Sequence, residues 1–366
     1  MATVTLTDRD LRDRLRLIRS ANVGSSAFRQ LLARYGTAGR ALDALPGLVR
    51  KGGYQGTALC SADEADDEIA AIEKLGAQLL QFDDDAYPPL LAEITGAPPI
   101  LTVLGNAALL SAPGIGMVGA RNASAAGIRF TRQLSGDLGA QGFVIVSGMA
   151  RGIDTAAHQA ALPTGTVAVM AGGVDVVYPA ENQALYEAIA ATGVIVCEMP
   201  LGTRPQARHF PRRNRLISGL SQGLVVVEAA LKSGSLITAN YAIEQGREVF
   251  AVPGSPLDPR CRGTNNLIRE GAVLTEGAED ILSNLQSWRR RPVSATQPSL
   301  GLEQNPAEAD DAARGSLMEK LGPTPMEVDE LIRQSGLTPE VVLTILLELE
   351  LAGRLDRHAG NKVSLA

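Results

Sequence analysis

The fold is decided by the stretch IGMVGARNASAAGIRFTRQLSGDLGAQGFVIVSGMARG, residues 115–152. It holds two apolar, β-rich runs, 115–120 and 143–150, with a helical stretch between them. Runs rich in Val and Ile that alternate with helices are typical of a parallel sheet covered on both faces. Four later runs repeat the pattern, at VAVMAGG (167–173), VIVCEM (194–199), LVVVEA (224–229) and VFAVPG (249–254). The sequence therefore predicts a parallel α/β sheet from about 96 to 285.

The flanking segments have other patterns. Residues 1–80 place apolar side chains at roughly helical spacing and predict a small helical N-terminal domain. Residues 286–313 are rich in Pro, Ser, Gln and Ala and predict a flexible linker. Residues 314–366 predict three helices and a β-hairpin, an order that matches a winged helix. We thus expect four parts, with the α/β domain over 81–285.

Charge is unevenly distributed along the chain, whose net charge is −6. Residues 1–60 hold ten Lys and Arg against four acids, whereas 61–95 hold ten acids against one Lys. A helical bundle with a solvated basic face is favoured for the N-terminal part over a nucleic-acid site, because exposed charge is usual on small domains. Residues 96–285 balance at fourteen of each sign.

The composition also bounds the location and the redox state. No apolar run reaches the length that spans a bilayer, and the N-terminus lacks the apolar core of a signal peptide, so the cytoplasm is expected. Cys60, Cys197 and Cys261 lie far apart without metal-ligand spacing. We therefore expect free thiols, and neither a disulfide framework nor a metal site.

Three strand tips have the pattern of anion sites. In each, a glycine lets the backbone approach a phosphate, and the start of the following helix favours a negative charge. None completes a nucleotide fingerprint, GxxxxGK[ST] or GxGxxG, so no cofactor is predicted. The candidate residues are Gly119, Arg121 and Ser124 at the first tip, Ser147, Gly148 and Arg151 at the second, and Lys232, Ser233, Gly234 and Ser235 at the third.

A fourth feature is the run RPQARHFPRRNR, residues 204–215, with five arginines. So dense a run of like charge repels itself unless an anion neutralises it, and basic stretches track phosphates. Phe210 is equally compatible with stacking on a base and with anchoring in the core. The run contributes the candidates Arg208, Phe210, Arg212, Arg213, Asn214 and Arg215.

The sequence contains few residue patterns that indicate catalysis. Asp154 and His158 lie four residues apart, but no motif ties a nucleophile to them, so a capping aspartate and a packed histidine are favoured. Asp175, Glu198 and Glu228 follow strands, where an isolated carboxylate more often orders an arginine or caps a loop than acts as an acid or base. No enzymatic activity is predicted.

The sequence closely resembles the DprA (Smf) family of bacterial DNA-processing proteins. The stretches that carry the resemblance span most of 115–272 in the family's order. They are MVGARNASAAG, SGMARGIDTAAHQAAL, VAVMAGGVDVVYPAENQALYEAI, CEMPLGTRPQARHFPRRNRLISGLS, VVEAALKSGSLITANYAIEQGREVFAVPGS and GTNNLIREGA.

The resemblance implies a Rossmann-like domain, flanked by a helical domain of the SAM or helix-hairpin-helix kind and by a winged helix. It further implies a homodimer that binds and protects incoming single-stranded DNA and loads the recombinase RecA in natural transformation, without catalytic turnover. By the same resemblance, Arg121 contacts the DNA backbone, the SGMARG loop lines the groove together with Arg212, Asn214 and Arg215, and Lys232 closes it with SGS.

Two places depart from expectation. At YPAEN (178–182), some family members carry a basic residue where this chain has Ala180, followed here by Glu181, and Arg208 or Arg213 are candidates to compensate. The last predicted helix of the winged helix has no Lys or Arg before Arg354 and contains three glutamates. Since duplex reading uses a basic recognition helix, this domain is better suited to a protein partner or to packing in an oligomer.

Two other functions compete with single-strand binding. One is a Rossmann-like enzyme on nucleotides of the phosphoribohydrolase type, although KSGSLITAN lacks the double glycine and nearby acid of the PGGxGT tip. The other is a protein-interaction scaffold in which DNA binding is incidental. Turnover of nucleoside monophosphates would favour the first, and RecA binding without DNA binding by 96–285 would favour the second.

Overall fold

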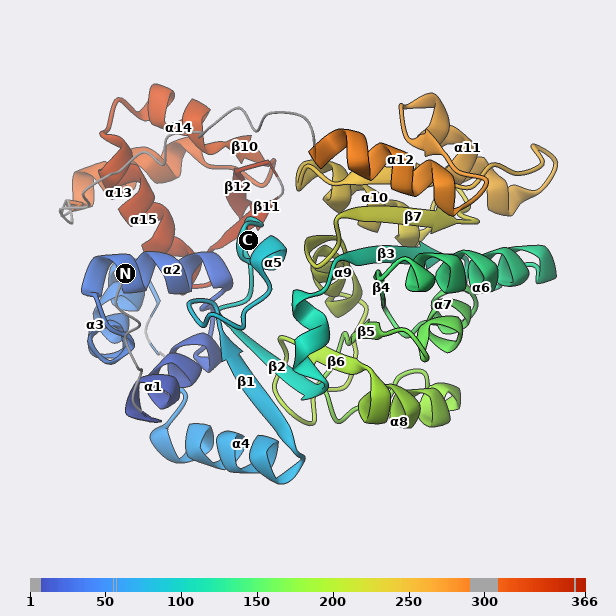
Figure 1. Cartoon of the computed structure of the whole chain (residues 1–366). Coiled ribbons are helices and arrows are strands. Elements are labelled where there is room, and N and C mark those ends of the chain that lie inside the picture. Colours follow the sequence, from blue (N-terminus) through green and yellow to red (C-terminus); the bar gives the residue numbers. More distant parts are fainter. Residues whose placement is uncertain (1–7, 55, 57, 290–308, 359) are drawn as a thin grey trace. The chain divides into compact units, whose positions relative to one another are not determined.

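A computed structural model describes residues 8–54, 56, 58–289, 309–358 and 360–366. The chain divides into two compact units. One combines residues Met1–Ile69 with Ala295–Ala366, and the other is Ala70–Ser294 (Figure 1). The predicted linker, 286–313, falls largely on residues outside those described.

The second unit contains a sheet of nine described strands. They are β1 Ala77–Gln81, β2 Ile100–Gly105, β3 Gly114–Gly119, β4 Val144–Ser147, β5 Thr166–Val169, β6 Val194–Cys197, β7 Gly223–Val227, β8 Glu248–Ala251 and β9 Val273–Leu274. Their order is β1-β2-β6-β5-β4-β3-β7-β8-β9. The six predicted strands form β3 to β8 and pair in parallel, which confirms the Rossmann-like core.

The sheet is mixed rather than wholly parallel. Strand β2 runs antiparallel to β6, and β1 runs antiparallel to β2, so the two strands extend one edge. A single antiparallel edge on a parallel sheet is common in doubly wound folds. The sequence prediction did not include this extension.

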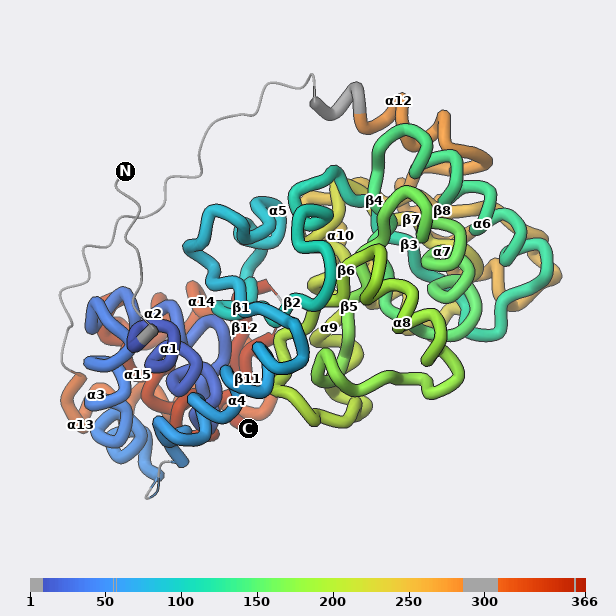
Figure 2. Tube along the Cα trace, turned by 60° about the horizontal axis from the view of Figure 1, so that its bottom comes forward, coloured from blue at the N-terminus to red at the C-terminus, as the bar shows by residue number. Residues whose placement is uncertain are grey.

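Helices cover both faces of the parallel strands. The helical segments of this unit are α5 Pro89–Ala92, η1 Ala107–Ser111, α6 Ala125–Ala140, α7 Ile153–Ala161, η2 Ala180–Asn182, α8 Gln183–Thr192, α9 His209–Gly219, α10 Gly234–Glu244, η3 Pro259–Cys261, α11 Arg262–Arg269 and α12 Ala278–Arg289. Figure 2 shows strands β3 to β8 between α6 and α7 on one side and α9 and α10 on the other.

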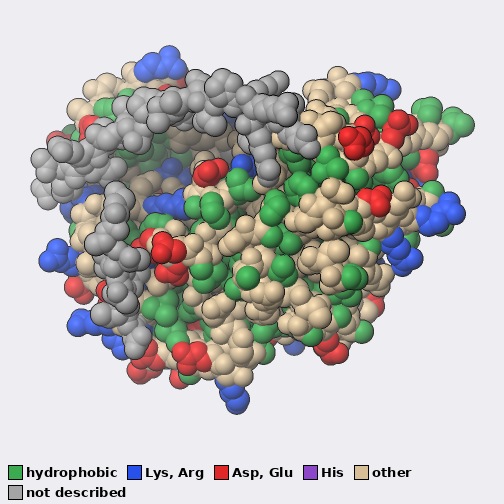
Figure 3. Space-filling view, viewed as in Figure 1, with side chains coloured by type: hydrophobic (Ala, Val, Ile, Leu, Met, Phe, Trp, Pro, Cys, Tyr) green, Lys and Arg blue, Asp and Glu red, His purple; other side chains and the backbone are tan. Residues whose placement is uncertain are grey.

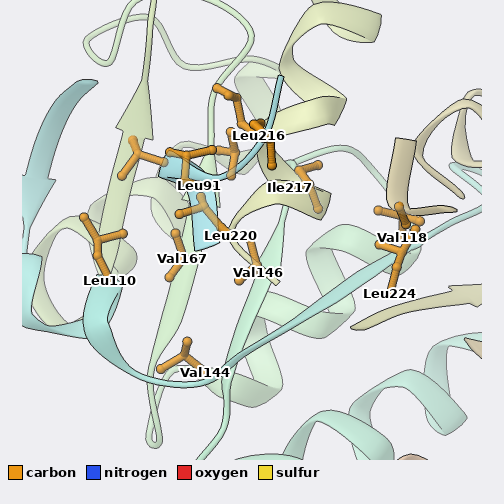
Figure 4. Packing of buried hydrophobic residues seen from close by; sticks show 14 of the residues in the cluster. Leu91, Leu110, Val118, Val144, Val146, Val167, Leu216, Ile217, Leu220 and Leu224 are labelled. Atoms are coloured by element: carbon orange, nitrogen blue, oxygen red, sulfur yellow. The ribbon is translucent and has the colours of Figure 1, made fainter. Parts of the chain in front are cut away.

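The alternation of side chains along each strand explains this layering. Ile115 of β3 packs in a core with Leu134 of α6. Val118 of the same strand packs in a second core with Leu216 and Ile217 of α9 (Figure 4). Because both faces are buried, the strands are continuous apolar runs, as expected of a parallel sheet.

The first unit begins with four helices, α1 Asp8–Arg19, α2 Ser25–Tyr35, α3 Ala38–Lys51 and α4 Ala62–Lys74, the last of which continues into the second unit. Arginines of α1 pair with carboxylates of α4. Arg12 lies 3.4 Å from Asp66, and Arg19 lies 2.8 Å from Glu68. The basic and acidic segments that the sequence separates thus neutralise each other in part.

The C-terminal part of this unit has the predicted winged-helix order. Its elements are α13 Asp311–Lys320, β10 Met326–Glu327, α14 Val328–Ser335, α15 Pro339–Leu351, β11 Leu355–His358 and β12 Lys362–Leu365. The hairpin forms as predicted, and β10 adds a third strand in the order β10-β12-β11. Glu348 of α15 is buried and bonds Arg314 of α13 at 2.8 Å. This glutamate therefore joins α15 to α13.

On the face seen in Figure 3, neither positive nor negative charge dominates the surface of the second unit. Basic and acidic side chains are scattered there among apolar and polar ones. This agrees with the equal numbers of basic and acidic residues in 96–285. On this face, no broad field of one sign of charge would attract an anion.

Candidate phosphate-binding site

A pocket of about 400 Å³ opens where strands β3 and β4 end and helices α9 and α10 begin. A smaller hollow of about 50 Å³ adjoins it and shares Arg121, Ala150 and Phe210. We call the two together the strand-tip cleft. Of the predicted residues, the cleft brings together Gly119, Arg121, Gly148, Arg151, Phe210, Arg213, Asn214, Ser233, Gly234 and Ser235.

The first tip supplies an exposed arginine. Gly119 ends β3 so close to β7 that a Cβ on it would lie 1.9 Å from the carbonyl oxygen of Val227. Only glycine fits there, and the chain then turns so that Arg121 reaches the cleft. The guanidinium of Arg121 stands 5.4 Å from the centre of the Phe210 ring. Arg121 is thus held at the mouth by a cation–π contact and remains open to a ligand.

The helix start after this tip is already occupied. Both the backbone N–H and the hydroxyl of Ser124 donate to the carboxylate of Glu228, the former at 2.8 Å. The Ser124 hydroxyl also accepts from the N–H of Gly127 at 2.9 Å. A carboxylate at a helix N-terminus satisfies the same donors and dipole that attract a phosphate. In this structure the anion at the start of α6 is Glu228.

The second tip is occupied in the same way. The hydroxyl of Ser147 donates to the carbonyl of Met117 at 2.6 Å, inside the sheet. The buried carboxylate of Asp154 accepts from the N–H groups of Gly148 and Ala150, each at 3.2 Å. Asp154 is therefore a structural carboxylate as expected, although it binds the loop before α7 and does not cap the helix, whose N-cap is Gly152. The backbone donors of this loop are therefore turned inward, and its exposed cation is Arg151.

The third tip is the open one. Ser233 caps α10 by accepting from the N–H of Ser235 at 3.2 Å, and the Ser235 hydroxyl donates to the carbonyl of Gly119 at 2.9 Å. Gly234, between them, is exposed and lines the main pocket beside Arg121. Lys232, two residues earlier, is exposed too, but it lines a neighbouring pocket and not the cleft. The start of α10 thus faces the cleft, and none of the carboxylates that the structure describes is seated on it, in contrast to the first two tips.

The arginine run divides into buried and exposed members. Arg213 is 6% exposed and donates to the carbonyls of Gly148 and Val169, the latter at 2.7 Å. Burial lowers its pKa to about 10, against the attraction of Asp154, so the guanidinium stays charged at neutral pH. Burial likewise raises the pKa of Asp154, and Arg213 opposes that rise. Arg213 is thus a charged strut beneath the cleft.

Arg215 and Arg212 share one carboxylate. Arg215 donates to Glu198 and, at 2.6 Å, to the carbonyl of Gly96, and its side chain is 12% exposed. Arg212 lies 3.0 Å from the same Glu198 but is half exposed. Arg208 is exposed and does not line the cleft. Within the described residues, the run therefore offers a ligand Arg204, Arg208 and Arg212, which are exposed, while Arg213 and Arg215 hold the fold.

The aromatic residue of the run is partly packed in the fold and partly open to the cleft. Phe210 is half-buried, with its ring 5.7 Å from that of Tyr178 and 6.0 Å from the guanidinium of Arg213. Tyr178 itself is 48% exposed and lines the small hollow. The two rings form an aromatic wall beside Arg121. Sequence reasoning missed Tyr178, whose only signal was a tyrosine in a loop that follows β5.

The other carboxylates singled out at strand ends are engaged by the fold. Asp175 accepts from the N–H of Gly202 at 2.9 Å, Glu198 binds the two arginines, and Glu228 binds Ser124. Their structural assignment is confirmed. Across the described ranges, no group of three His, Cys, Asp or Glu is placed to hold a metal ion.

His158 is a buried neutral histidine. Its Nδ1 lies 2.6 Å from the Thr166 hydroxyl, which itself donates to the carbonyl of Ile145, so Nδ1 carries the proton. Burial, reinforced by repulsion from Arg213, lowers the pKa of His158 to about 3. The predicted packed histidine is confirmed.

This histidine makes stability dependent on pH. Unfolded, His158 has a pKa near 6.5, so below that pH the unfolded chain binds a proton that the folded chain does not. Its contribution is present above pH 6.5 and is lost as pH falls towards 3. We expect a loss of about 1.5–2 kcal/mol between pH 6.5 and 5, measured by urea denaturation. His158→Asn should flatten this slope whereas His358→Asn, on the surface, should not; equal slopes in both would contradict the assignment.

No described helix combines the length and the apolar character that crossing a membrane requires.

Comparison with known proteins gives one consistent result. The family model of DNA recombination-mediator protein A matches residues 78–286. The models of a DprA-like N-terminal HHH domain and a DprA winged helix domain match residues 8–71 and 302–361. Protein Smf of Escherichia coli (strain K12) is 40% identical over 298 residues, which cover 80% of this chain and 79% of that protein.

Two solved structures are similar as well. DNA processing protein A from Streptococcus pneumoniae matches with a TM-score of 0.62 and 34% identity, covering 76% of this chain and 98% of that one. DNA processing protein A from Helicobacter pylori matches with a TM-score of 0.53 and 29% identity, covering 58% of this chain and 96% of that one. The latter structure was reported for its single-stranded DNA binding mode.

Proposed function

This chain belongs to the DNA recombination-mediator protein A (DprA/Smf) family, and on that premise we propose that it binds single-stranded DNA in the strand-tip cleft. It acts on DNA without catalysis, protecting incoming single strands and loading RecA onto them during natural transformation. The similarity to the Helicobacter pylori protein supports the first part of this proposal.

The observation that carries the proposal is the open start of α10 beside an exposed arginine and an aromatic wall. A phosphate at Gly234 would be stabilised by the positive end of the α10 dipole and by the charge of Arg121. A base attached to it reaches Phe210 and Tyr178, on which every base can stack. This combination suits a polynucleotide of any sequence, because the phosphate and the ring face are common to all nucleotides.

The proposal assigns different roles to the predicted residues. Those assigned to contact DNA within the cleft are Arg121, Arg151, Phe210, Gly234 and the newly found Tyr178. The exposed Arg208, Arg212 and Lys232 lie outside its lining and are assigned to the strand where it continues beyond the cleft. Gly119, Gly148, Ser233, Ser235 and Asn214 shape the cleft, and Asn214 donates to the carbonyl of Gly234 at 3.3 Å. Ser124, Ser147, Arg213 and Arg215 support it from within.

A nucleotide-processing enzyme is the weaker alternative. The tip at 232–240 brings no carboxylate to the main pocket, whose one acidic residue is Asp154. That carboxylate is buried and already accepts from two backbone N–H groups. A general acid or base needs a proton path to the substrate, and Asp154 faces its own loop instead.

The test is a competition between single- and double-stranded DNA of the same sequence at several salt concentrations. We expect preference for the single strand, little dependence on base sequence, and affinity that falls steeply with salt. Equal binding of the duplex would contradict the proposed stacking wall. Incubation with nucleoside monophosphates, followed by chromatography for freed base, tests the enzymatic alternative.

Two partners complete the proposal, a second copy of the chain and RecA. Apolar side chains exposed along α10 and just before it, Leu231, Ile237 and Ile243, support association of two copies. Mass measured in solution tests the dimer. Co-sedimentation of RecA with the full chain, with and without single-stranded DNA, tests the second contact.

A further inference from the structure

One exposed ion pair stands at the edge of the strand-tip cleft. The guanidinium of Arg151 binds the carboxylate of Glu181 through two parallel contacts, Nε to Oε1 and Nη2 to Oε2, the latter at 2.7 Å. The side chains are 61% and 53% exposed. The hydrogen bond from Arg151 also lowers the pKa of Glu181, so the carboxylate is charged at neutral pH.

The pair lies where DNA is proposed to pass. Arg151 lines the small hollow together with Arg121, Tyr178 and Phe210. A negative charge at this place opposes an incoming phosphate. Glu181 is therefore not explained by the proposed binding alone.

The carboxylate is presented from a fixed backbone. Glu181 lies in η2, whose last residue, Asn182, is buried. The side-chain amide of Asn182 donates to the carbonyl of Met149 at 2.8 Å and to the hydroxyl of Thr155 at 3.0 Å. These bonds tie η2 to the loop that carries Arg151, so the two charged groups face each other by construction.

The pair contributes little to stability, because exposed ion pairs are screened by water and salt. Its geometry matters more. A carboxylate and a phosphate both bind the planar fork of arginine through two parallel hydrogen bonds. Glu181 and a DNA phosphate therefore compete for the same N–H donors of Arg151.

Resting on the proposed function, we propose that Glu181 is a built-in competitor of the DNA backbone, which a phosphate displaces from Arg151 when a single strand enters the cleft. The site then holds single strands less tightly than its cations alone would allow. Weaker binding of this kind suits a protein that transfers a bound single strand to another protein.

The experiment measures binding of a fluorescent single-stranded oligonucleotide to the full chain between low and moderate salt. Glu181→Gln keeps the shape and removes the charge. We expect it to tighten binding about threefold to fivefold at low salt. The salt dependence should steepen by less than about 0.7 in log–log slope, the contribution of one whole phosphate, since Arg151 then faces the DNA without a nearby carboxylate.

Two further variants separate competition from net charge. Glu187→Gln removes an equal charge from an exposed position on α8, outside the cleft, and should change affinity less than about twofold. In a chain that already carries Arg151→Ala, adding Glu181→Gln should not tighten DNA binding, because the N–H donors for which the carboxylate competed are gone. A gain that Glu187→Gln shares, or that survives the loss of Arg151, overturns the proposal.

The two proposals fail in different ways. If the unmodified chain does not bind the oligonucleotide, the proposed single-strand binding is wrong, and so is the competing role of Glu181. If the unmodified chain binds and Glu181→Gln binds no better, the competitor alone is wrong.

Discussion

Replacing Arg213 with alanine is expected to lower the free energy of unfolding by about 3–5 kcal/mol. The guanidinium is buried and donates to the carbonyls of Gly148 and Val169. Its loss removes both of these hydrogen bonds and the cation that favours the charge on buried Asp154. Urea denaturation at pH 7 measures the change.

The matched control is the neighbouring arginine. Arg212→Ala removes the same side chain from a half-exposed position, and Glu198 keeps its pair with Arg215. We expect a loss below about 1 kcal/mol. Equal losses in the two variants would show that Arg213 is not the strut that its burial indicates.

This contrast marks what the sequence can predict about the site. The density of the run at 204–215 indicated an anion site, and the structure does place part of that run at the cleft. The sequence alone does not show that Arg213 is buried and Arg212 exposed, because that difference in burial depends on the direction in which α9 begins. Neighbours on a helix point about 100° apart, so one meets solvent and the other the sheet.

The helix N-termini also show that long-range contacts cannot be predicted from local sequence. Glycine and serine after a strand predicted three anion sites, and two of these starts are occupied by Glu228 and Asp154. Asp154 lies near its loop in sequence, so its structural role could be predicted. Glu228 is 104 residues from Ser124, and only the pairing of β3 with β7 brings them together.

The fold itself was largely predictable. Strands buried on both faces appear as continuous Val- and Ile-rich runs, which is why β3 to β8 were all identified. The edge strands β1 and β2 were not identified, since AQLLQ and ILTVLG resemble many short apolar segments. Their pairing is antiparallel and depends on long-range contacts that no local pattern encodes.

The largest expected change in DNA binding comes from the two cations that flank the start of α10. Arg121→Ala combined with Lys232→Ala should weaken single-strand binding by about 2–3 kcal/mol, or roughly 30- to 150-fold, since each loses a charge-assisted contact to phosphate. The salt slope should fall by about 1.4, for two fewer neutralised phosphates. Both side chains are exposed, so folding should be preserved.

The control removes two arginines from the same unit outside the cleft. Arg129 and Arg132 of α6 are exposed and do not line it. Their double replacement by alanine changes net charge by the same amount and should alter affinity only a few-fold, through long-range attraction. Titration of a labelled single strand with both variants decides the matter. If the two lose affinity equally, binding follows overall charge, and the start of α10 is not the phosphate site.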